Sequence, residues 1–595
     1  MSDNSSKFTD ENHDDDDCID RFEPPPALLA GAHVSGMKSY KELYEKSINN
    51  ANEFWRTIAK NLYFEHRSNL GLEWNFDPRK GKVFTNFMKG SKTNIAFNCL
   101  ERNIHHGYGS RTALIWEGNN QTDSHSLTYD ELLNKVITFS AVLKTHGIRK
   151  GDVVAVYLPM ILELPITLLA CCRIGAIHSV IFAGYSANAL ATRIMQTKAR
   201  LLVTCDLYFR GKKLIPIKAI VNEALDICNK QGNPLRTVVV VDHSSRIHLS
   251  DGMVLEEMSY VSGRDVFWKD EMRRCEGMKT SIEWCGSEDP LFILCTSGST
   301  GKPKGLVHTL AGYMVYTYAT TKYIFDTHHD DIFWCTADCG WITGHSFVVY
   351  GPLLNGVTSV VYEGIPTYPD FSRMWQIVEK YKVNTLYTSP TVIRALMAKS
   401  DEYLQNHDRS TLRVLASAGE PIDPSAWKWF YSVVGENRCA LLDTYWQTEA
   451  GGPLITPLPG ATTLKPGSAT LPFFGVEVAI LDERGNEVEG IGEGNLCIKS
   501  AWPSICRSIY GDQACFESTY FTSFPGYFFT GDSARRDADG YIWVTGRVDD
   551  LINVSGHLLS TAEIEAALAS DSDVAEVAVV AVPHEIKGSS PYAFL

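Results

Sequence analysis

Short runs of β-branched and other apolar residues recur along the chain and alternate with stretches of helical character. LTYDELLNKVITFSAVLKTHG places apolar residues three and four positions apart, which predicts an amphipathic helix. Strands are predicted at GDVVAVYLPM, ARLLVTCD, RTVVVVD, PLFILCT, DIFWCTAD, TSVVYEG, VNTLYTSP, LRVLASAG and CALLDTY. Buried strands that alternate with helices indicate an α/β fold, with mostly parallel sheets that helices cover on both faces.

Past Leu471 the apolar pattern changes from continuous runs to alternation. VEVAILDERGNEVEGIGEGNLCIK alternates on either side of a DERGN turn, and TGDSARRDADGYIWVTGR does so around DADG. Two alternating runs joined by turn residues predict an antiparallel hairpin. We therefore expect a small antiparallel β unit at about residues 471–548, and one more strand at VAEVAVVAVP.

Several predicted parallel strands end in polar or glycine-rich clusters: TSGST, TADCGW, YEGIP, TSPT, SAGEP and TYWQTE. Ligands bind beyond the carboxyl ends of such strands, so we expect these clusters to converge on one crevice. The first continues as TSGSTGKPKG, whose glycines, hydroxyls and lysines suit a phosphate. It is not the nucleotide P-loop, because Lys302 is followed by Pro303 where that motif has Ser or Thr. Taken alone, the loop is a modest signal, and a purely structural turn is the default interpretation.

The net charge of the chain argues against some classes of function. A net charge of −15 at pH 7 argues against a general nucleic-acid surface. Residues 1–23 hold nine acids and two bases, which predicts a disordered acidic head, with a specific docking tail as the alternative. The acidic N-terminus also lacks the apolar run of a signal peptide.

The most apolar region, residues 151–184, is interrupted by prolines and by charged residues such as Glu163 and Arg173. It therefore predicts core strands and a helix, and no membrane span. The 15 cysteines lack zinc-finger spacing, which favours buried thiols in a reducing compartment. We therefore expect neither nucleic acid nor membrane as a partner.

Six motifs follow one another along the chain: TSGSTGKPKG, SAGEP, TYWQTE, YFFTGD, GRVDD and NVSGH. In this order they resemble the adenylate-forming acyl-CoA synthetase superfamily, from about Arg21 to Leu595. CTADCGWITGHSFVVYGPLLNG, EGIPTYPD and DTYWQTEAGG are similar to the AMP-forming acetyl-CoA synthetases, and FEPPP and NVSGHLLSTAEIE to their eukaryotic cytosolic type. The resemblance implies two half-reactions. Acetate and MgATP give acetyl-adenylate and pyrophosphate, and coenzyme A then displaces AMP.

The resemblance also implies a domain organisation. Residues 24–548 would form an N-terminal adenylation domain with two helix-covered, mostly parallel sheets and the antiparallel unit. Residues 549–595 would be an incomplete α+β mobile domain, which turns about a hinge at Asp549. Only 595 − 549 = 46 residues follow this hinge, and the family's P-K-T-R-S-G-K motif, whose last lysine assists adenylation, is missing. Leu558 also replaces an arginine of the bacterial pattern. We expect this chain to bind nucleotide but to make adenylate poorly.

For adenylation the resemblance implies cations and donors around the phosphates, where negative charge concentrates. Thr296, Lys304, Thr448 and Glu449 are the expected catalytic residues. Glu449 is also the expected Mg²⁺ ligand, because a hard cation prefers carboxylate oxygen. The expected contacts to ATP or AMP are Gly419, Glu420, Pro421, Asp443, Thr444, Tyr445, Trp446, Gln447, Thr448, Asp532 and Arg547. Asp532 would accept both ribose hydroxyls.

The acid pocket is expected to be lined by Trp341, Ile342, Thr343, Ala418 and Trp446, with the Trp446 indole leaving room for a short acid only. The family's acetate enzymes usually have a bulkier valine at the position of Ala418, so propionate is expected to be tolerated better than usual. Two alternatives to an acetate–CoA ligase stay open: a propionate–CoA ligase, and a catalytically silent nucleotide-binding form.

For coenzyme A, the resemblance points to the turn FRGKK, which holds three positive charges after a predicted strand. The expected coenzyme A residues are Arg210, Gly211, Lys212, Lys213, Thr343, Ser555 and Gly556. An ordinary basic surface turn is the alternative interpretation of FRGKK. The implied substrates are the small molecules acetate, ATP and coenzyme A, with Mg²⁺ as cofactor. With the resemblance we expect a cytoplasmic monomer, and a nuclear pool is left open.

Overall fold

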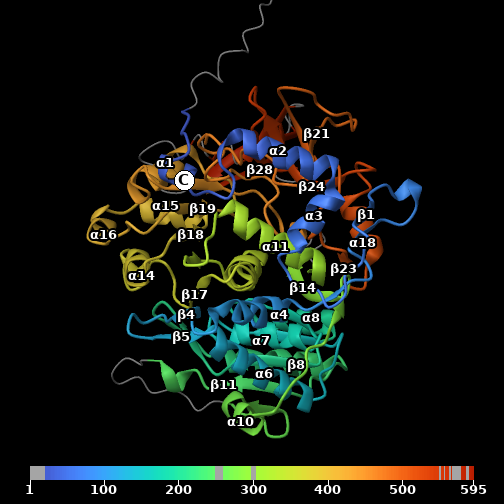
Figure 1. Ribbon diagram of the computed structural model, residues 1–595, viewed down its shortest axis with the longest axis vertical. Helices are drawn as coiled ribbons and strands as arrows, with labels where there is room; N and C mark the ends of the chain where they lie inside the picture. Colours follow the sequence, from blue (N-terminus) through green and yellow to red (C-terminus); the bar gives the residue numbers. More distant parts are fainter. Residues whose placement is uncertain are drawn as a thin grey trace, which may run out of the picture.

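The computed structural model describes residues 20–247, 259–296, 303–548, 551–554, 557–561, 564–565, 568, 578–584 and 588–594. Two large sheets dominate this part of the chain, and helices pack around them (Figure 1). The eight-stranded sheet has the order β12 (Asp265–Phe267), β11 (Val238–Val241), β8 (Leu201–Cys205), β6 (Val153–Tyr157), β7 (Ile177–Val180), β14 (Pro290–Thr296), β15 (Lys304–Thr309) and β23 (Ser508–Ile509). The seven-stranded sheet has the order β20 (Ala440–Asp443), β19 (Val414–Ser417), β18 (Thr385–Thr388), β16 (Ile332–Cys335), β17 (Thr358–Tyr362), β4 (Thr112–Glu117) and β5 (Ser124–Thr128).

Parallel pairing prevails in both large sheets. Neighbouring strands from β12 to β14 run parallel, and so do those from β20 to β4. The strands β15, β23 and β5 join antiparallel. Each of the nine apolar runs predicted as strands coincides with a strand of these two sheets, so the predicted α/β class is confirmed.

The predicted amphipathic helix is α6 (Tyr129–Thr145), which begins with a capping box between Thr128 and Glu131. It packs against α7 (Glu163–Arg173), every residue of which is buried. The other helices are α1 (Pro26–Leu29), α2 (Gly36–Asn49), α3 (Ala51–Ala59), α4 (Ile95–Cys99), α5 (Glu101–Asn103), α8 (Ala187–Thr197), α9 (Ile217–Lys230), α10 (Trp268–Arg274), α11 (Leu310–Ile324), α12 (Ile342–Gly344), α13 (Gly351–Leu354), α14 (Arg373–Tyr381), α15 (Pro390–Met397), α16 (Glu402–Gln405), α17 (Pro424–Trp429) and α18 (Gln513–Tyr520).

The seven-stranded sheet is buried on both faces, against two separate hydrophobic cores. Along β18, Tyr387 belongs to one core and Leu386 to the other. Ala416 and Leu415 divide in the same way along β19. Because successive side chains of a strand point to opposite faces, apolar layers cover this sheet on both sides, as the continuous apolar runs predicted.

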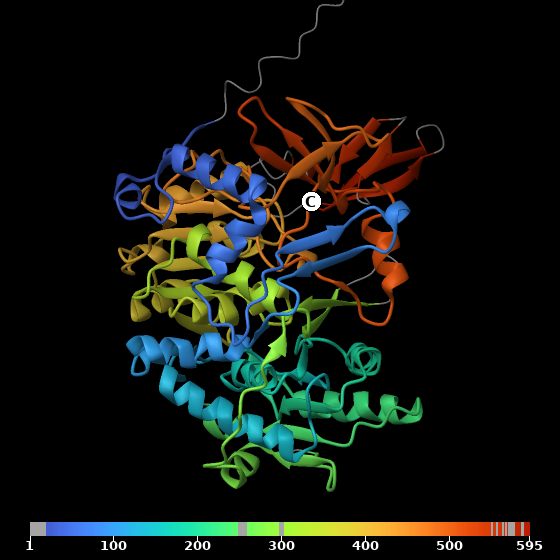
Figure 2. The ribbon, with the colours of Figure 1, turned by 45° about the vertical axis from the view of Figure 1, so that its right-hand side comes forward.

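An antiparallel sheet follows, formed by β21 (Val478–Leu481), β22 (Gly492–Ile498), β24 (Phe528–Arg536) and β25 (Ile542–Arg547). In Figure 2 the orange and red strands of this region lie at the top, beyond the hairpin of β1 (Leu72–Asn75) and β2 (Phe84–Phe87). The antiparallel unit was predicted, but the same stretch also sends β23 into the eight-stranded sheet. A second antiparallel sheet has the order β27 (His557–Ser560), β26 (Leu551–Val554), β29 (Gly588–Phe594) and β28 (Ala578–His584).

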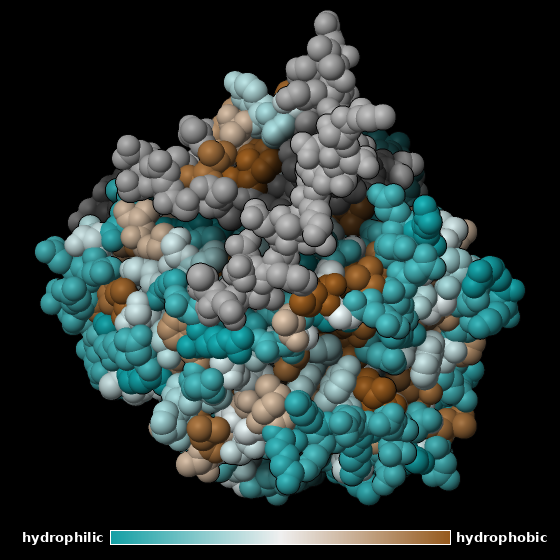
Figure 3. All heavy atoms as spheres, turned by 90° about the horizontal axis from the view of Figure 1, so that it is seen from above, coloured by the Kyte–Doolittle hydropathy of each residue, from teal (hydrophilic) through white to brown (hydrophobic). Residues whose placement is uncertain are grey.

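Residues 1–19 lie outside the described residues, so the acidic head stays a prediction. Phe22 packs on Trp427 and Tyr431, with ring centroids 5.0 and 4.8 Å apart. Where residues are coloured in Figure 3, the face is mostly hydrophilic, with hydrophobic residues in small groups. None of the described helices has the length and apolar character needed to span a bilayer. Among the described cysteines, only Cys295 and Cys515 are not buried.

Candidate active site

The clusters that follow β16, β18, β19 and β20 meet at one edge of the seven-stranded sheet. The hydroxyls of Thr336 and Thr388, beside the ends of β16 and β18, lie 2.8 Å apart. Thr444, directly after β20, donates from Oγ1 to the Ser417 carbonyl at the end of β19, at 2.8 Å. Parallel strands thus bring TADCGW, TSPT, SAGEP and TYWQTE together, as expected.

Trp446 is oriented by a chain of hydrogen bonds. Its Nε1 donates to Tyr387 Oη at 3.1 Å, and that hydroxyl lies 2.7 Å from Thr444 Oγ1. Because the Thr444 hydroxyl already donates its proton to the Ser417 carbonyl, the Tyr387 hydroxyl is the donor in its contact with Thr444. Phe347 packs edge-on against the half-buried indole, with ring centroids 5.4 Å apart. Asp443, just before this segment, is buried, and burial raises its pKa to about 7.

The other residues expected around the acid differ in exposure. Ile342 and Ala418 are buried and Thr343 is half-buried, whereas Trp341 is 48% exposed. Trp341 packs on Phe182, with ring centroids 4.6 Å apart. The guanidinium of Arg210 lies 5.3 Å from the centre of the same Phe182 ring. Phe182 therefore links an expected acid-pocket residue with the basic turn.

Asp532, in β24, receives two hydrogen bonds from the TYWQTE segment. Tyr445 Oη and Gln447 Nε2 donate to its Oδ2 at 2.5 and 2.7 Å. Arg547, on the neighbouring strand β25, lies 3.7 Å from Oδ1. Burial raises the pKa of Asp532, while the hydrogen bond from Tyr445 and the charge of Arg547 oppose that rise. Each carboxylate oxygen has two acceptor sites, so Asp532 retains capacity for a ligand hydroxyl.

Lys304 and Glu449 both contact Tyr520. Oε1 of Glu449 accepts a 2.5 Å hydrogen bond from Tyr520 Oη. Lys304 is the first residue of β15 and pairs with Thr296, the last residue of the antiparallel neighbour β14. Its Nζ lies 5.9 Å from the centre of the Tyr520 ring and donates to Thr519 Oγ1 at 3.5 Å. A carboxylate and an ammonium group thus stand around one aromatic residue.

Thr448 is anchored through its backbone. Its carbonyl oxygen lies 2.8 Å from His308 Nε2, and the other ring nitrogen lies 3.1 Å from the Ser504 carbonyl. Burial lowers the pKa of His308 to about 3, so the ring is neutral at pH 7 and carries one N–H. We assign that proton to Nε2, because its contact is the shorter. Thr448 and Glu449 begin the turn η7 (Thr448–Ala450), which this bond fixes on β15.

The segment 419–421 follows β19. Gly419 has a φ of +107°, a conformation that glycine adopts without strain. The Glu420 side chain accepts from the Thr391 backbone N–H at 2.7 Å and pairs with Arg394 at 2.9 Å. Its carboxylate is therefore directed to α15, which leaves the backbone of this segment for a nucleotide contact.

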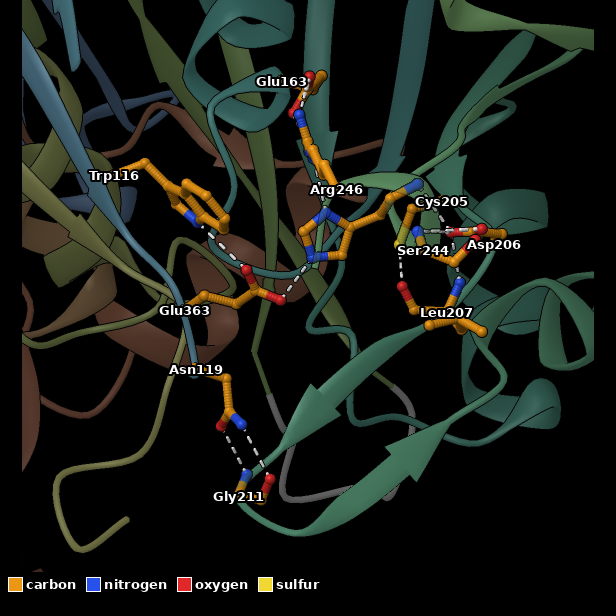
Figure 4. Close-up of polar contacts among 11 residues, drawn as sticks. Trp116, Asn119, Glu163, Cys205, Asp206, Leu207, Gly211, Ser244, Arg246 and Glu363 are labelled. Carbon is orange, nitrogen blue, oxygen red and sulfur yellow. Dashed lines mark hydrogen bonds and ion pairs between the residues drawn. The ribbon is translucent and has the colours of Figure 1, made fainter. Parts of the chain in front are cut away.

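The basic turn FRGKK lies between β9 (Tyr208–Arg210) and β10 (Lys213–Ile215). Arg210, Lys212 and Lys213 are exposed, and Gly211 is buried. In Figure 4 the Asn119 side chain faces Gly211, with two dashed hydrogen bonds between them. The three cations therefore project from a turn whose central glycine is held against the body of the protein.

Some expected site residues lie outside the described residues. These are Asp549, Ser555 and Gly556, together with the loop residues 297–302. Their roles stay predictions.

One cluster of metal-ligand type occurs in the described part of the chain, at His33, Asp326 and His328. Its polar groups already have partners. Asp326 Oδ1 accepts from the His33 backbone N–H at 2.8 Å, and His33 Nε2 lies 2.9 Å from the Thr327 carbonyl. Arg413 stands 3.6 Å from Asp326 Oδ2, and its charge opposes a bound cation. We interpret this cluster as a tie between the N-terminal segment and the core.

Sequence reasoning missed four residues that orient the site: Asn119, His308, Tyr387 and Tyr520. None of them lies in a recognised motif. Tyr387 had the best available signal, because it belongs to VNTLYTSP, a predicted strand that ends at the expected crevice. The sequence gives no indication of the other three, because each contacts a partner far along the chain.

Comparisons with known proteins show to which family the chain belongs. The model of the AMP-binding enzyme family matches residues 100–508, that of the acetyl-coenzyme A synthetase N-terminus matches residues 40–99, and that of the AMP-binding enzyme C-terminal domain matches residues 563–595. The chloroplastic/glyoxysomal acetyl-coenzyme A synthetase of Arabidopsis thaliana is 51% identical, over 96% of this chain and 76% of the relative. The acetyl-coenzyme A synthetase of Drosophila melanogaster is 50% identical, over 96% of this chain and 86% of the relative. Acetyl-coenzyme A synthetase 2 of Pseudomonas aeruginosa is 49% identical, over 96% of this chain and 85% of the relative. The chain therefore belongs to the AMP-binding enzyme family.

Proposed function

We propose that this chain is an acetate–CoA ligase. A carboxylate oxygen of acetate attacks the α-phosphorus of ATP, and the bond to the pyrophosphate breaks. The sulfur of coenzyme A then attacks the acyl carbon, AMP leaves, and the thiol proton is released. The names of the relatives support acetate over propionate and over a silent nucleotide-binding form.

The observation that carries this proposal is the segment 443–449. It combines the oriented Trp446 indole, two donors to Asp532, and Glu449, within seven consecutive residues. In the proposed reaction Trp446 closes the acid pocket behind the methyl group. Asp532 accepts the ribose hydroxyls, with Arg547 beside it. A wall for a small acid and the nucleotide contacts thus share one stretch of chain.

The phosphate end of the proposed site depends on electrostatics. Lys304 would neutralise charge that develops on the pyrophosphate, and Thr296 and Thr448 would donate hydroxyl hydrogen bonds there. Glu449 suits Mg²⁺, because a carboxylate that accepts one hydrogen bond still has lone pairs for a hard cation. When bound, Mg²⁺ would act as a Lewis acid on the phosphate oxygens.

Coenzyme A would enter on the side of the basic turn. Arg210, Lys212 and Lys213 would bind the phosphates of its nucleotide part, as charge-assisted contacts. Thr343 would lie between the acid and the thiol. Asp549 would be the hinge, with Ser555 and Gly556 beside the pantetheine.

Acid-dependent exchange of pyrophosphate into ATP tests this function, because exchange needs the first half-reaction alone. We expect exchange with acetate, at the low rate anticipated for this chain, less exchange with propionate, and none without acid. Glu449→Gln should lower acetate-dependent exchange by roughly a hundredfold, since a lost metal contact costs several kcal/mol. Trp446→Gly should shift exchange toward longer acids. Nucleotide binding without exchange for any acid would contradict the proposal.

We also propose a cytoplasmic location and a monomeric state. The burial of nearly all described cysteines suits a reducing compartment. Cell fractionation tests the location, and light scattering tests the monomer.

A further inference from the structure

The charges of the basic turn, residues 210–213, suit it to bind an anion. Among the described residues, no carboxylate forms an ion pair with Arg210, Lys212 or Lys213, whereas Lys218 pairs with Asp265 and Arg246 with Glu163. Unpaired cations on one short turn attract phosphate, but long side chains on a mobile turn hold it poorly. The position of the turn therefore matters as much as its charge.

Asn119 fixes that position. Its Nδ2 donates to the Gly211 carbonyl, and its Oδ1 accepts from the Gly211 N–H, each at 2.9 Å (Figure 4). One carboxamide thus satisfies both backbone groups of the residue at the centre of the turn. Gly211 has a φ of +62°, a left-handed conformation that favours glycine. Asn119 follows β4, so this contact joins the turn to the seven-stranded sheet.

The turn also lies close against the segment after β17. A Cβ atom on Gly211 would stand 3.0 Å from Ile365 Cδ1, so there is little room for the turn to shift inward. That segment starts from the buried Glu363. Glu363 accepts from Trp116 Nε1, in β4, at 3.2 Å. The two strand ends that carry Asn119 and Ile365 are therefore tied to each other.

A chain of hydrogen bonds through the buried His243 extends this tie to the eight-stranded sheet. Arg246 Nε donates to His243 Nδ1 at 2.8 Å, so the His243 proton lies on Nε2. His243 Nε2 then donates to Glu363 at 2.7 Å. Arg246 in turn makes two 2.7 Å hydrogen bonds to Glu163, in α7. Figure 4 shows Glu163, Arg246 and Glu363 along this path, which holds the ends of β4, β11 and β17 together.

We propose that Asn119 is a positioning residue for coenzyme A, which holds the turn 210–213 so that its cations face the phosphates of the nucleotide part. This inference rests on the proposed function. Asn119 itself touches no reacting atom and acts through Gly211. Without the carboxamide, the turn keeps its three charges but loses its fixed orientation.

Calorimetric titration with coenzyme A and with dephospho-coenzyme A, which lacks the 3′-phosphate, tests this role. Asn119→Ala should bind coenzyme A roughly tenfold more weakly, as expected for two lost hydrogen bonds. Its preference for coenzyme A over dephospho-coenzyme A should shrink. Acetate-dependent pyrophosphate exchange should stay at the wild-type level, because that step needs no coenzyme A. Asn120→Ala, one position along, is the matched control and should bind coenzyme A normally.

Coenzyme A binding by Asn119→Ala within twofold of wild type would overturn the inference. So would a parallel loss of exchange and of coenzyme A binding in a folded variant, because that indicates a purely structural role. If Asn119→Ala does not fold, Asn119→Asp replaces it. That carboxylate still accepts from the Gly211 N–H but cannot donate to its carbonyl, so weaker coenzyme A binding is again expected. Failure of the proposed function is a separate result, namely no acetate-dependent exchange by the unmutated chain.

Discussion

The Tyr520 hydroxyl donates a 2.5 Å hydrogen bond to Glu449 Oε1, and its ring lies 5.9 Å from Lys304 Nζ. Burial and the neighbouring Glu449 charge raise the pKa of Tyr520 far above its usual value, so the phenol keeps its proton at neutral pH. The donor of this hydrogen bond is therefore fixed. Tyr520 therefore orients Glu449, the proposed Mg²⁺ ligand, while its ring faces Lys304, the lysine proposed to neutralise the phosphates.

Tyr520→Phe should lower acetate-dependent pyrophosphate exchange by about tenfold at limiting Mg²⁺, because a hydrogen bond to a charged group contributes about 1.5–3 kcal/mol. Excess Mg²⁺ should restore part of the activity, since the carboxylate remains. Tyr527→Phe is the matched control, because Tyr527 donates to Glu487 at 2.9 Å on the exposed side of the antiparallel sheet. Equal Mg²⁺ dependence of Tyr520→Phe and wild type would show that Tyr520 has no such role.

AMP binding should weaken as the pH falls, because the raised pKa of Asp532 brings its protonation closer to neutral pH. The charged carboxylate accepts ribose hydroxyls best, and that form is lost as the pH drops through the raised pKa. The groups around it are Tyr445, Gln447, Arg547 and Glu449. Calorimetric titration of AMP from pH 5 to pH 8 measures the effect. Asp532→Asn should bind weakly at every pH, so a pH-dependent Asp532→Asn would assign the titration to another group.

The sequence predicted what local patterns encode. Continuous apolar runs predicted nine of the fifteen strands of the two large sheets. The motif TYWQTE predicted Tyr445 and Gln447 as nucleotide contacts, and the structure shows that both donate to Asp532. Contacts between distant parts of the chain carry no such signal. Tyr520 meets Glu449 across 71 positions, and Asn119 meets Gly211 across 92. In each case the folded arrangement, and no periodicity or motif, brings the partners together.

Lys465 should be a strong stability determinant, because it is a buried cation between two carboxylates. Its Nζ lies 2.5 Å from Asp537 Oδ2 and 2.6 Å from Asp539 Oδ2, while Lys465 itself is 3% exposed. Lys465→Met leaves the buried Asp537 charge unpaired and should cost about 3–5 kcal/mol of unfolding free energy. Urea unfolding measures this change.

Lys499→Met is the control for Lys465→Met. Lys499 also stands between two carboxylates, at 2.6 Å from Glu487 and 3.9 Å from Glu477, but it is 31% exposed in its side chain. Solvent screens that pair, so the control should lose less than about 1 kcal/mol. Equal losses for the two variants would mean that burial does not set the strength of the Lys465 contacts.

Ala418 should set the balance between acetate and propionate. It is buried directly after β19, where its N–H donates to the Thr388 carbonyl at 3.1 Å. Ala418→Val adds two methyl groups beside the proposed acid pocket. Specificity constants from pyrophosphate exchange should then fall about tenfold for propionate and little for acetate, since one methylene contributes about 1–3 kcal/mol to discrimination. Ala418→Gly should move the ratio the other way, because it removes a methyl group. If neither variant changes the ratio of the specificity constants for propionate and acetate, Ala418 lies outside the acid pocket. Trp446 would then be the residue that limits the length of the acid.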